Sequence, residues 1–219
     1  MSDKGFDLDA SLDSLTVHEE GRWIREACGV TRYETPIPVL VDVEAYTPVC
    51  SRHRILLIGG LSGGIEDLDL AIRAITLLGD SARVALSSIP CANPDGFLFN
   101  VGPENGSGGN PGVGYPPNDG YYFDKCNPEI RYLWRWVCFM APDIVLEVRS
   151  GLEIGWEATD EISDLGMALG ATRLGPTDSM LAALAIGRPS GLFPVPGLRL
   201  TSNESVLEDQ LGDFMGAIL

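Results

Sequence analysis

The sequence contains little histidine, little positive charge and no long apolar run. Of its 219 residues only two are histidines, and 15 lysines and arginines face 31 aspartates and glutamates, which gives a formal net charge of −16. So acidic a chain repels a phosphate backbone, and nucleic acid is therefore not expected as a partner. No apolar stretch approaches the ~20 residues of a membrane helix, so no membrane-spanning segment is predicted.

Paired cysteines are also lacking. The five cysteines are scattered, odd in number and never arranged as C-x-x-C: Cys28, Cys50, Cys91, Cys126 and Cys138. A structural zinc site needs closer spacing and a disulfide framework needs an even number, so reduced thiols are predicted. The polar, acidic start has neither the basic nor the apolar part of a secretory signal, which favours a cytoplasmic location.

The composition and length indicate one folded domain. A hydrophobic content of 45% over 219 residues suffices for a single domain with its own core. Residues 1–15 lack apolar periodicity and are expected to form a loose tail, so we assign the domain to residues 16–219.

The clearest structural unit spans residues 54–89. Residues 54–60, RILLIGG, form a continuous apolar run typical of a strand buried on both faces. Apolar residues then recur at helical spacing up to Gly79, and residues 83–89, RVALSSI, indicate a second buried strand. This succession predicts a βαβ unit, and hence parallel strands joined by a right-handed crossover.

The rest of the chain completes an α/β pattern. A helix from Asn127 to Pro142 would begin with a capping residue, a first-turn proline and an acid near the positive end of its dipole. The glycine- and proline-rich residues 100–124 are expected to form a long loop. Residues 39–43 form a short β-branched run, residues 143–149 are predicted to form a third strand, and helices are expected around 157–169, 178–186 and 204–217. We therefore predict a mixed, largely parallel sheet flanked by helices.

The glycine-rich turn after the first of these buried strands admits two functional interpretations. Its residues GLSGG match G-x-S-x-G, the setting of a hydrolase nucleophile, which would be Ser62. In that fold the base histidine follows the serine, whereas His18 and His53 both precede it, so a serine hydrolase is disfavoured. A phosphate-binding loop is disfavoured too, because no P-loop lysine follows and Glu66 and Asp67 would repel an anion. A flexible turn is the favoured interpretation.

Three segments, in order, resemble the zinc carboxypeptidases of the carboxypeptidase A type. Residues 55–64, ILLIGGLSGG, look like the strand that ends in the family's His-x-x-Glu metal motif. Residues 89–97, IPCANPDGF, are similar to its second strand and Asn-Pro-Asp-Gly turn. Residues 128–151, PEIRYLWRWVCFMAPDIVLEVRSG, resemble the helix beginning Pro-Glu-x-Arg and the strand that delivers the third zinc ligand. The resemblance implies the family's fold, with closing strands shortened or replaced because the chain is short for the family.

Carried over residue by residue, the resemblance places non-ligands at the zinc positions. The family's two histidines fall at Ser62 and Arg149, and its glutamate falls at Ile65, with Glu66 one place away. A hydroxyl, an aliphatic side chain and a guanidinium cannot hold zinc, so no cofactor is expected. The family's substrate-binding asparagine–arginine pair would lie in residues 110–117, which contain no arginine, and its general-base glutamate has no match downstream.

The leading hypothesis is therefore a non-catalytic protein that binds a small carboxylate or a peptide. The expected pocket residues are Ser62, Asp95, Glu147 and Arg149, with Arg149 holding the anion bidentately. An equally weighted alternative is that Arg149 only forms an ion pair with Glu147 or Glu66 at the edge of the sheet.

Two further hypotheses stay open. The first is a peptidase or amidase that uses non-standard residues, with Ser62 and Glu66 as weak catalytic candidates and a metal held by Glu66, Asp95 or Glu147. The second is an interaction module. It would be favoured if the aromatic residues on the helix after Asn127 were exposed and not packed in the core; these residues are Tyr132, Trp134, Trp136 and Phe139. The sequence indicates no oligomeric state.

Overall fold

The predicted βαβ unit lies at the centre of the computed structural model. Strands β3 (His53–Ile58) and β4 (Val84–Ile89) pair in parallel, and helix α2 (Ile65–Gly79) connects them. Every residue of β4 is buried, as are residues 55–58 of β3, because both faces of these strands are covered. The parallel pairing predicted from the two apolar runs is confirmed.

The structure describes residues 7–18, 22–45, 47, 50–117, 126–175, 177, 179–186 and 194–218. The remaining elements are α1 (Leu8–His18), β1 (Trp23–Val30), β2 (Pro36–Asp42), α3 (Pro94–Phe99), α4 (Glu129–Met140), β5 (Ile144–Ser150), β6 (Gly155–Ala158), η1 (Asp160–Ile162), α5 (Ser163–Ala168), β7 (Thr172–Arg173), α6 (Met180–Ile186), β8 (Gly197–Ser202) and α7 (Leu207–Ala217). No helix in this described part is both long enough and apolar enough to cross a bilayer.

The strands form one 8-stranded sheet of order β1-β2-β4-β3-β5-β8-β6-β7. Its centre, β4-β3-β5-β8, is parallel, whereas β1 and β2 on one side are antiparallel to their neighbours. On the other side β6 is antiparallel to β8 and parallel to β7. The mixed, largely parallel sheet is thus as predicted. From β3 the chain moves outward to β4 and then returns past β3 to β5, so the strand order reverses between β3 and β5.

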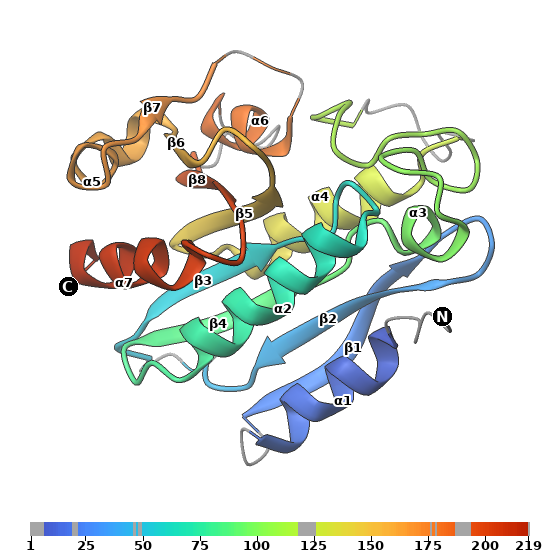
Figure 1. Ribbon diagram of the computed structural model, residues 1–219, viewed down its shortest axis with the longest axis horizontal. Coiled ribbons are helices and arrows are strands. Elements are labelled where there is room, and N and C mark those ends of the chain that lie inside the picture. The colour runs from blue at the N-terminus through green and yellow to red at the C-terminus, as the bar shows by residue number, and fades with distance from the viewer. Residues whose placement is uncertain are drawn as a thin grey trace.

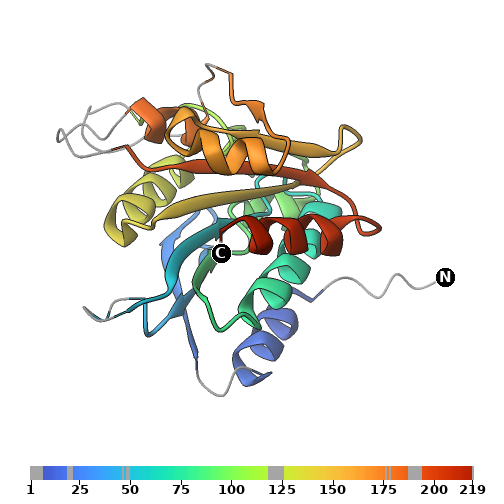
Figure 2. The same ribbon diagram turned by 90° about the vertical axis from the view of Figure 1, so that its left-hand side faces the viewer.

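Helices cover both faces of the sheet (Figures 1 and 2). Helices α1, α2 and α7 pack on one face over a core that includes Leu57, Ile75 and Phe214. Helices α4 and α6 cover the other face over a second core that includes Leu56 and Val145. Successive side chains of a strand point to opposite faces, which is why the neighbours Leu56 and Leu57 belong to different cores.

The amino-terminal segment contains more structure than a loose tail. Residues 8–18 form α1, whose Leu12 and Leu15 are buried in the first core. Two leucines spaced for one helix face are enough to dock a short helix, but they are too few to stand out as a periodicity. Residues 1–6 of the predicted tail lie outside the described residues.

The helix predicted around 157–169 is wrong in its first part. Residues 155–158 form strand β6, which pairs antiparallel with β8, and only α5 and the short η1 are helical. Pairing with a neighbouring strand supplies hydrogen bonds that outweigh a weak local helix pattern. The other two late helices correspond to α6 and α7, although residue 178 of the first prediction lies outside the described residues.

Candidate functional site

The reversal of strand order marks one position on the sheet as a site for ligands. In open α/β sheets, ligands bind beyond the carboxyl ends of the strands where the order reverses, because the loops there diverge and leave a crevice. In this fold the position lies between β3 and β5. The loop that contains Ser62 follows β3, and Arg149 lies at the end of β5. The topology therefore brings together two residues that the sequence predicted for the site.

The buried carboxylate of Asp67 connects these two strand ends. Asp67 is 1% exposed, and its Oδ2 accepts a hydrogen bond of 3.1 Å from the backbone N–H of Ser62. Its Oδ1 accepts a second hydrogen bond from the backbone N–H of Ser150, directly after Arg149. Asp67 thus holds the loop after β3 against the end of β5, and it is a positioning residue for the whole site.

The glycines of the loop after β3 are required by close packing. Gly63 has a φ of +65°, and a Cβ built on it would lie 2.5 Å from the carbonyl oxygen of Gly102 and 2.9 Å from the Cα of Gly96. Gly96, in α3, is itself too close to Gly102 to carry a side chain. Three backbone segments therefore meet here without side chains between them.

The Asn-Pro-Asp-Gly turn has a clear structural role. The Asn93 side chain accepts a 3.0 Å hydrogen bond from the N–H of Gly96, and so caps α3. Its Nδ2 donates weakly, at 3.3–3.5 Å, toward the carbonyl oxygens of Gly102, Pro103 and Glu104. Asn93 thereby fixes the start of the long loop beside the site.

Arg149 belongs to a charged network that crosses three strands. Glu147 lies on β5 and is 1% exposed. Its carboxylate forms an ion pair with Arg149 and accepts a 2.6 Å hydrogen bond from Arg199 Nε on β8. Arg199 also donates a 2.9 Å hydrogen bond to Glu157 on β6. Two arginines and two glutamates leave this network formally neutral. The ion pair between Arg149 and Glu147, which was one of the two predicted alternatives, is therefore present.

That ion pair does not use all of Arg149. Only Nε contacts Glu147, and neither terminal nitrogen of the guanidinium has a hydrogen-bond partner among the described residues. The side chain is 34% exposed. A Cβ at Gly112 would lie 3.9 Å from its Nη2, so the absence of a side chain at Gly112 leaves the guanidinium uncovered on that side.

Tyr115 closes the site toward α4. Its O–H donates a 2.8 Å hydrogen bond to the carbonyl of Pro111, and its ring lies 6.1 Å from that of Trp134. Burial raises the pKa of the Tyr115 phenol well above its usual value, and the charges of Glu147 and Glu129 add to this, against the opposing charge of Arg149. The phenol therefore stays neutral at physiological pH.

The other predicted site residues lie in different environments. Ser62 is half-buried, and its Oγ accepts a 3.1 Å hydrogen bond from the N–H of Gly64. Glu66, in the first turn of α2, is exposed. Asp95 is 1% exposed, and neither of its carboxylate oxygens has a hydrogen-bond partner in the part of the chain that the structure describes.

The described residues give Ser62 no histidine as a catalytic base. His53 begins β3, whereas Ser62 follows its far end, roughly 20 Å away at ~3.3 Å per residue. The side chain of His18 lies outside the described part of the chain. The geometry agrees with the interpretation of the GLSGG segment as a turn.

The residues at the zinc positions do not fit zinc. The Ser62 hydroxyl is engaged by the loop backbone, Ile65 has no donor atom, and Arg149 has no lone pair to offer. Strand β8, with the sequence GLRLTS, contains no acidic residue, so it places no carboxylate beside β5 that could act as a metal ligand or general base. Within the described residues, no group of three His, Cys, Asp or Glu side chains is placed to hold a metal ion. No step through zinc follows from this set of side chains.

Two residues of the site could not be picked out from the sequence. Arg199 lies 52 residues from its partner Glu147, and only the pairing of β5 with β8 brings them together. In the sequence, Asp67 stands out only as an acid that would repel phosphate. Its spacing of five residues from Ser62 suits a loop-closing hydrogen bond, but acids at helix starts are too common for this to be a signal.

The aromatic residues of α4 are mostly core residues. Trp134 is 7% exposed and packs in the second core, with Tyr132 and Trp136 partly buried against it. Phe139 is 71% exposed and lies 5.9 Å from the ring of Trp136. One exposed ring gives little support to an interaction surface on this helix.

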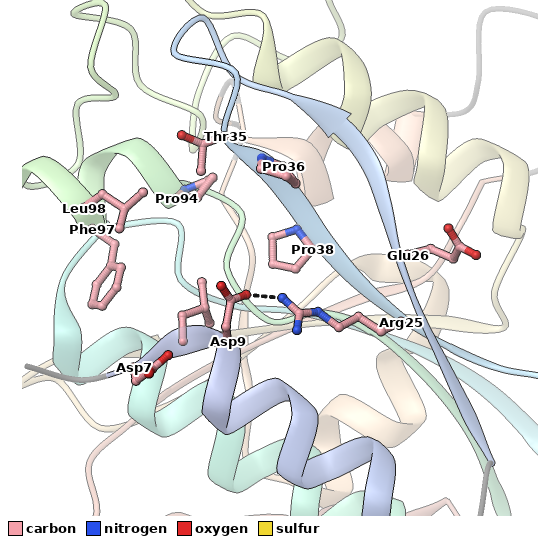
Figure 3. A pocket seen from close by; sticks show the side chains of 11 residues that line it. Asp7, Asp9, Arg25, Glu26, Thr35, Pro36, Pro38, Pro94, Phe97 and Leu98 are labelled. Atoms are coloured by element: carbon pink, nitrogen blue, oxygen red, sulfur yellow. Dashed lines mark hydrogen bonds and ion pairs between the residues drawn. The ribbon is translucent and has the colours of Figure 1, made fainter.

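A second concave feature lies away from the strand ends. A groove of about 490 Å³ separates α1 from β1, β2 and α3, and prolines 36, 38 and 94 line it (Figure 3). Arg25 points across it toward α1, where it pairs with Asp9 and, at 2.7 Å, with Asp13. Arg25, the one arginine among the described residues that line this groove, is therefore already paired with acids of α1.

The sheet order, the two helical layers and the loop positions define the class of the protein. It has the fold of the metallopeptidases of the carboxypeptidase type. A metallo-carboxypeptidase from Burkholderia cenocepacia superposes with a TM-score of 0.69 at 13% identity, over 97% of this chain and 68% of that one. A metallo-carboxypeptidase from Pseudomonas aeruginosa, in complex with (2-guanidinoethylmercapto)succinic acid, superposes with a TM-score of 0.67 at 14% identity, over 97% of this chain and 68% of that one.

A third solved structure has a different named activity. The murein-tripeptide amidase MpaA from Escherichia coli O157 superposes with a TM-score of 0.57 at 15% identity, over 92% of this chain and 95% of that one. Neither a family model nor a curated protein sequence matches this chain. At these identities the likeness establishes the fold and leaves the activity to be argued from the site.

Proposed function

We propose that this chain is a carboxypeptidase-like protein with a degenerate metal site, which binds a small carboxylate or a peptide and does not catalyse zinc-dependent hydrolysis. The observation that carries the proposal is Arg149, whose terminal nitrogens have no partner among the described residues, at the strand end where the fold family's third zinc ligand would be expected.

The chemistry of a guanidinium suits this role. Its two terminal N–H groups form a planar fork that matches a carboxylate bidentately, and such charge-assisted hydrogen bonds are about twice as strong as neutral ones. Arg199 already pairs with the buried Glu147, so Arg149 is not the only counter-ion of that carboxylate. Its positive charge therefore stays partly available to a ligand.

Binding of carboxylates to Arg149→Ala tests the proposal. Succinate, a dipeptide with a free carboxyl terminus and (2-guanidinoethylmercapto)succinic acid would be titrated calorimetrically into the protein. Loss of a charge-assisted bidentate contact worth ~1.5–3 kcal/mol weakens binding by about ten- to a hundredfold. Arg149→Lys keeps the charge without the fork and should recover only part of the affinity.

The matched control is Arg54→Ala. Arg54 is also a strand arginine, and it pairs with Asp143 at 2.7 Å, but it lies at the amino end of β3, away from the site. This variant should bind the same probes as the unmodified protein does. Unchanged affinity in Arg149→Ala for every probe that binds would refute the binding role.

A retained peptidase or amidase activity is the second candidate, favoured by the named activities of the structural neighbours. It requires a metal held by Glu66, Asp95, Glu147 or other residues. Metal analysis of the purified protein separates the two functions. Stoichiometric zinc, with peptide or amide hydrolysis that a chelator abolishes, would establish the second function and overturn the first.

A further inference from the structure

The groove between α1 and α3 has mostly apolar walls. Its volume of about 490 Å³ lies in the range of cavities that hold small organic ligands. Strand β2 contributes Pro36 and Pro38 to the lining, and α3 contributes Pro94 and Leu98, of which Leu98 is 57% exposed (Figure 3). A proline has no backbone N–H, so this part of the lining offers an anion no donor. It offers an apolar group a surface on several sides.

The charged groups around the groove leave a surplus of negative charge. Asp7, Asp9 and Glu26 line the groove, and Arg25 is the one basic residue among the described residues that do so. Arg25 is already paired with Asp9 and with Asp13, which is also on α1. The dipole of α1 adds only about half a positive charge at its N-terminal end. Four carboxylates therefore outweigh one guanidinium and this half charge, so the groove attracts cations and repels anions.

Two of these carboxylates keep oxygens that are available to a ligand. Asp7 Oδ1 accepts a 3.0 Å hydrogen bond from the N–H of Ala10 and so caps α1, whereas its Oδ2 has no partner among the described residues. Glu26 forms no hydrogen bond or ion pair with any described residue. Both side chains are exposed. A cationic group can thus pair with either of them without displacing an existing partner.

We propose that this groove binds a small organic cation with an apolar body, such as a primary ammonium group carried on an aromatic or branched aliphatic skeleton. The proline and leucine side chains would cover the body, and the carboxylates at the start of α1 would hold the cationic group. The ring of Phe97, which also lines the groove, adds an aromatic surface that suits both parts of such a ligand.

Other occupants fit the groove less well. Within the described residues no three His, Cys, Asp or Glu side chains are grouped to hold a metal ion. An anion would meet the surplus negative charge and the prolines. A second copy of the chain carries the same formal charge of −16, and the two copies would repel each other.

The groove is separate from the site of Arg149, and helix α3 contacts both regions. Pro94 and Leu98 line the groove, whereas Gly96 packs closely against Gly63 in the loop after β3. The proposal stands or falls without reference to what Arg149 binds.

NMR titration with three probes of similar shape tests the proposal. Benzylamine, benzyl alcohol and benzoate carry a positive, a neutral and a negative group on the same ring. Benzylamine should shift the amide resonances of Leu8, Glu26 and Leu98. Benzyl alcohol should bind about two- to fivefold more weakly, because a partly exposed ion pair contributes that much, and benzoate should bind more weakly still.

Asp7→Asn removes one charge and keeps the helix cap, since asparagine caps as well as aspartate does. It should weaken the binding of benzylamine about two- to fivefold, and that of benzyl alcohol less. Asp164→Asn is the matched control. It removes an exposed acid from the first turn of α5, which contacts β6 on the other side of the sheet, and it should bind benzylamine as the unmodified protein does.

Any of three results would overturn the proposal. The first is benzylamine that shifts no amide of the groove up to millimolar concentration. The second is equal affinity of the unmodified protein for benzylamine and benzyl alcohol, which would mean that the groove selects apolar bulk alone. The third is an equal loss in Asp7→Asn and Asp164→Asn, which would mean that only the overall charge matters. Should Asp7→Asn not fold, the comparison of probes on the unmodified protein still decides.

Discussion

Burial changes the acid–base chemistry of individual side chains in this fold. It raises the pKa of the Cys28 and Cys91 thiols to about 12, and for Cys91 the charges of Asp67 and Asp95 add to the effect. Thiols with such pKa values are neither nucleophiles nor metal ligands at neutral pH. No disulfide joins any of the five cysteines within the described residues, and the reduced state of the thiols stays a prediction from their spacing.

Glu129 should make the stability of the protein depend on pH. The pKa of its carboxyl is raised by burial above the ordinary value of 4.5, so the folded chain keeps this proton to higher pH than the unfolded chain does. Its stabilising contribution is complete below that ordinary value and is lost as pH rises through the raised pKa. The free energy of unfolding should therefore fall less steeply with pH in Glu129→Gln than in the unmodified protein.

Urea denaturation at several pH values measures this dependence. Glu153→Gln, which changes an exposed glutamate, should follow the unmodified curve. If Glu129→Gln followed it as well, the buried carboxyl would not be the group that titrates.

At the scale of secondary-structure elements, the contact of the loop after β3 with α3 is the tightest in the site. Gly63→Ala would force a side chain into a left-handed backbone conformation, at ~1–2 kcal/mol, and against the backbone of Gly96 and Gly102, at a further ~1–3 kcal/mol. We expect a loss of at least about 2 kcal/mol in the free energy of unfolding. Chemical denaturation followed by circular dichroism measures it.

Gly64→Ala is the matched control for that change. Gly64 has no positive φ, and the nearest atom to an added Cβ is the Ser62 hydroxyl at 3.3 Å. Its substitution should cost well under 1 kcal/mol, in line with a surface change. Equal losses in the two variants would mean that the loop does not pack on α3 as described.

The elements that could be predicted are those whose burial leaves a pattern in the sequence. Strands β3, β4 and β5 are covered on both faces and therefore appear as apolar runs. Strand β1 lies at the edge of the sheet with Arg25 and Glu26 exposed or half-exposed, so it shows no such run and was missed. Strand β6 is hydrogen-bonded to β8, which is distant in the sequence, and no local sequence pattern indicates this pairing.

The candidate site was predictable only in part, for the same reason. Motif positions pointed to Ser62 and Arg149, because each follows or ends a recognisable strand. The partners that decide their chemistry, Asp67 and Arg199, are common residue types brought close by tertiary structure alone. That the Asp95 carboxylate has no hydrogen-bond partner among the described residues is likewise a property of the folded chain and has no trace in the sequence.

At the scale of the whole molecule, the formal net charge of −16 should make stability depend on salt. Repulsion among excess negative charges opposes the compact state, and raising the ionic strength from 0.01 to 0.15 M shortens the screening length from ~30 Å to ~8 Å. The melting temperature should therefore rise over this range of NaCl. A fall would show that surface ion pairs, such as Arg73 with Glu204, outweigh the general repulsion.

The shared carboxylate of Glu147 has a consequence for how this protein can change. Arg199 remains beside Glu147 when Arg149 is replaced, so a substitution at position 149 does not leave the buried Glu147 carboxylate without a counter-ion. Selection can thus vary the side chain at the mouth of the crevice while the sheet beneath keeps its electrostatic balance. Position 149 is on this account the natural place to engineer a new ligand preference into the scaffold.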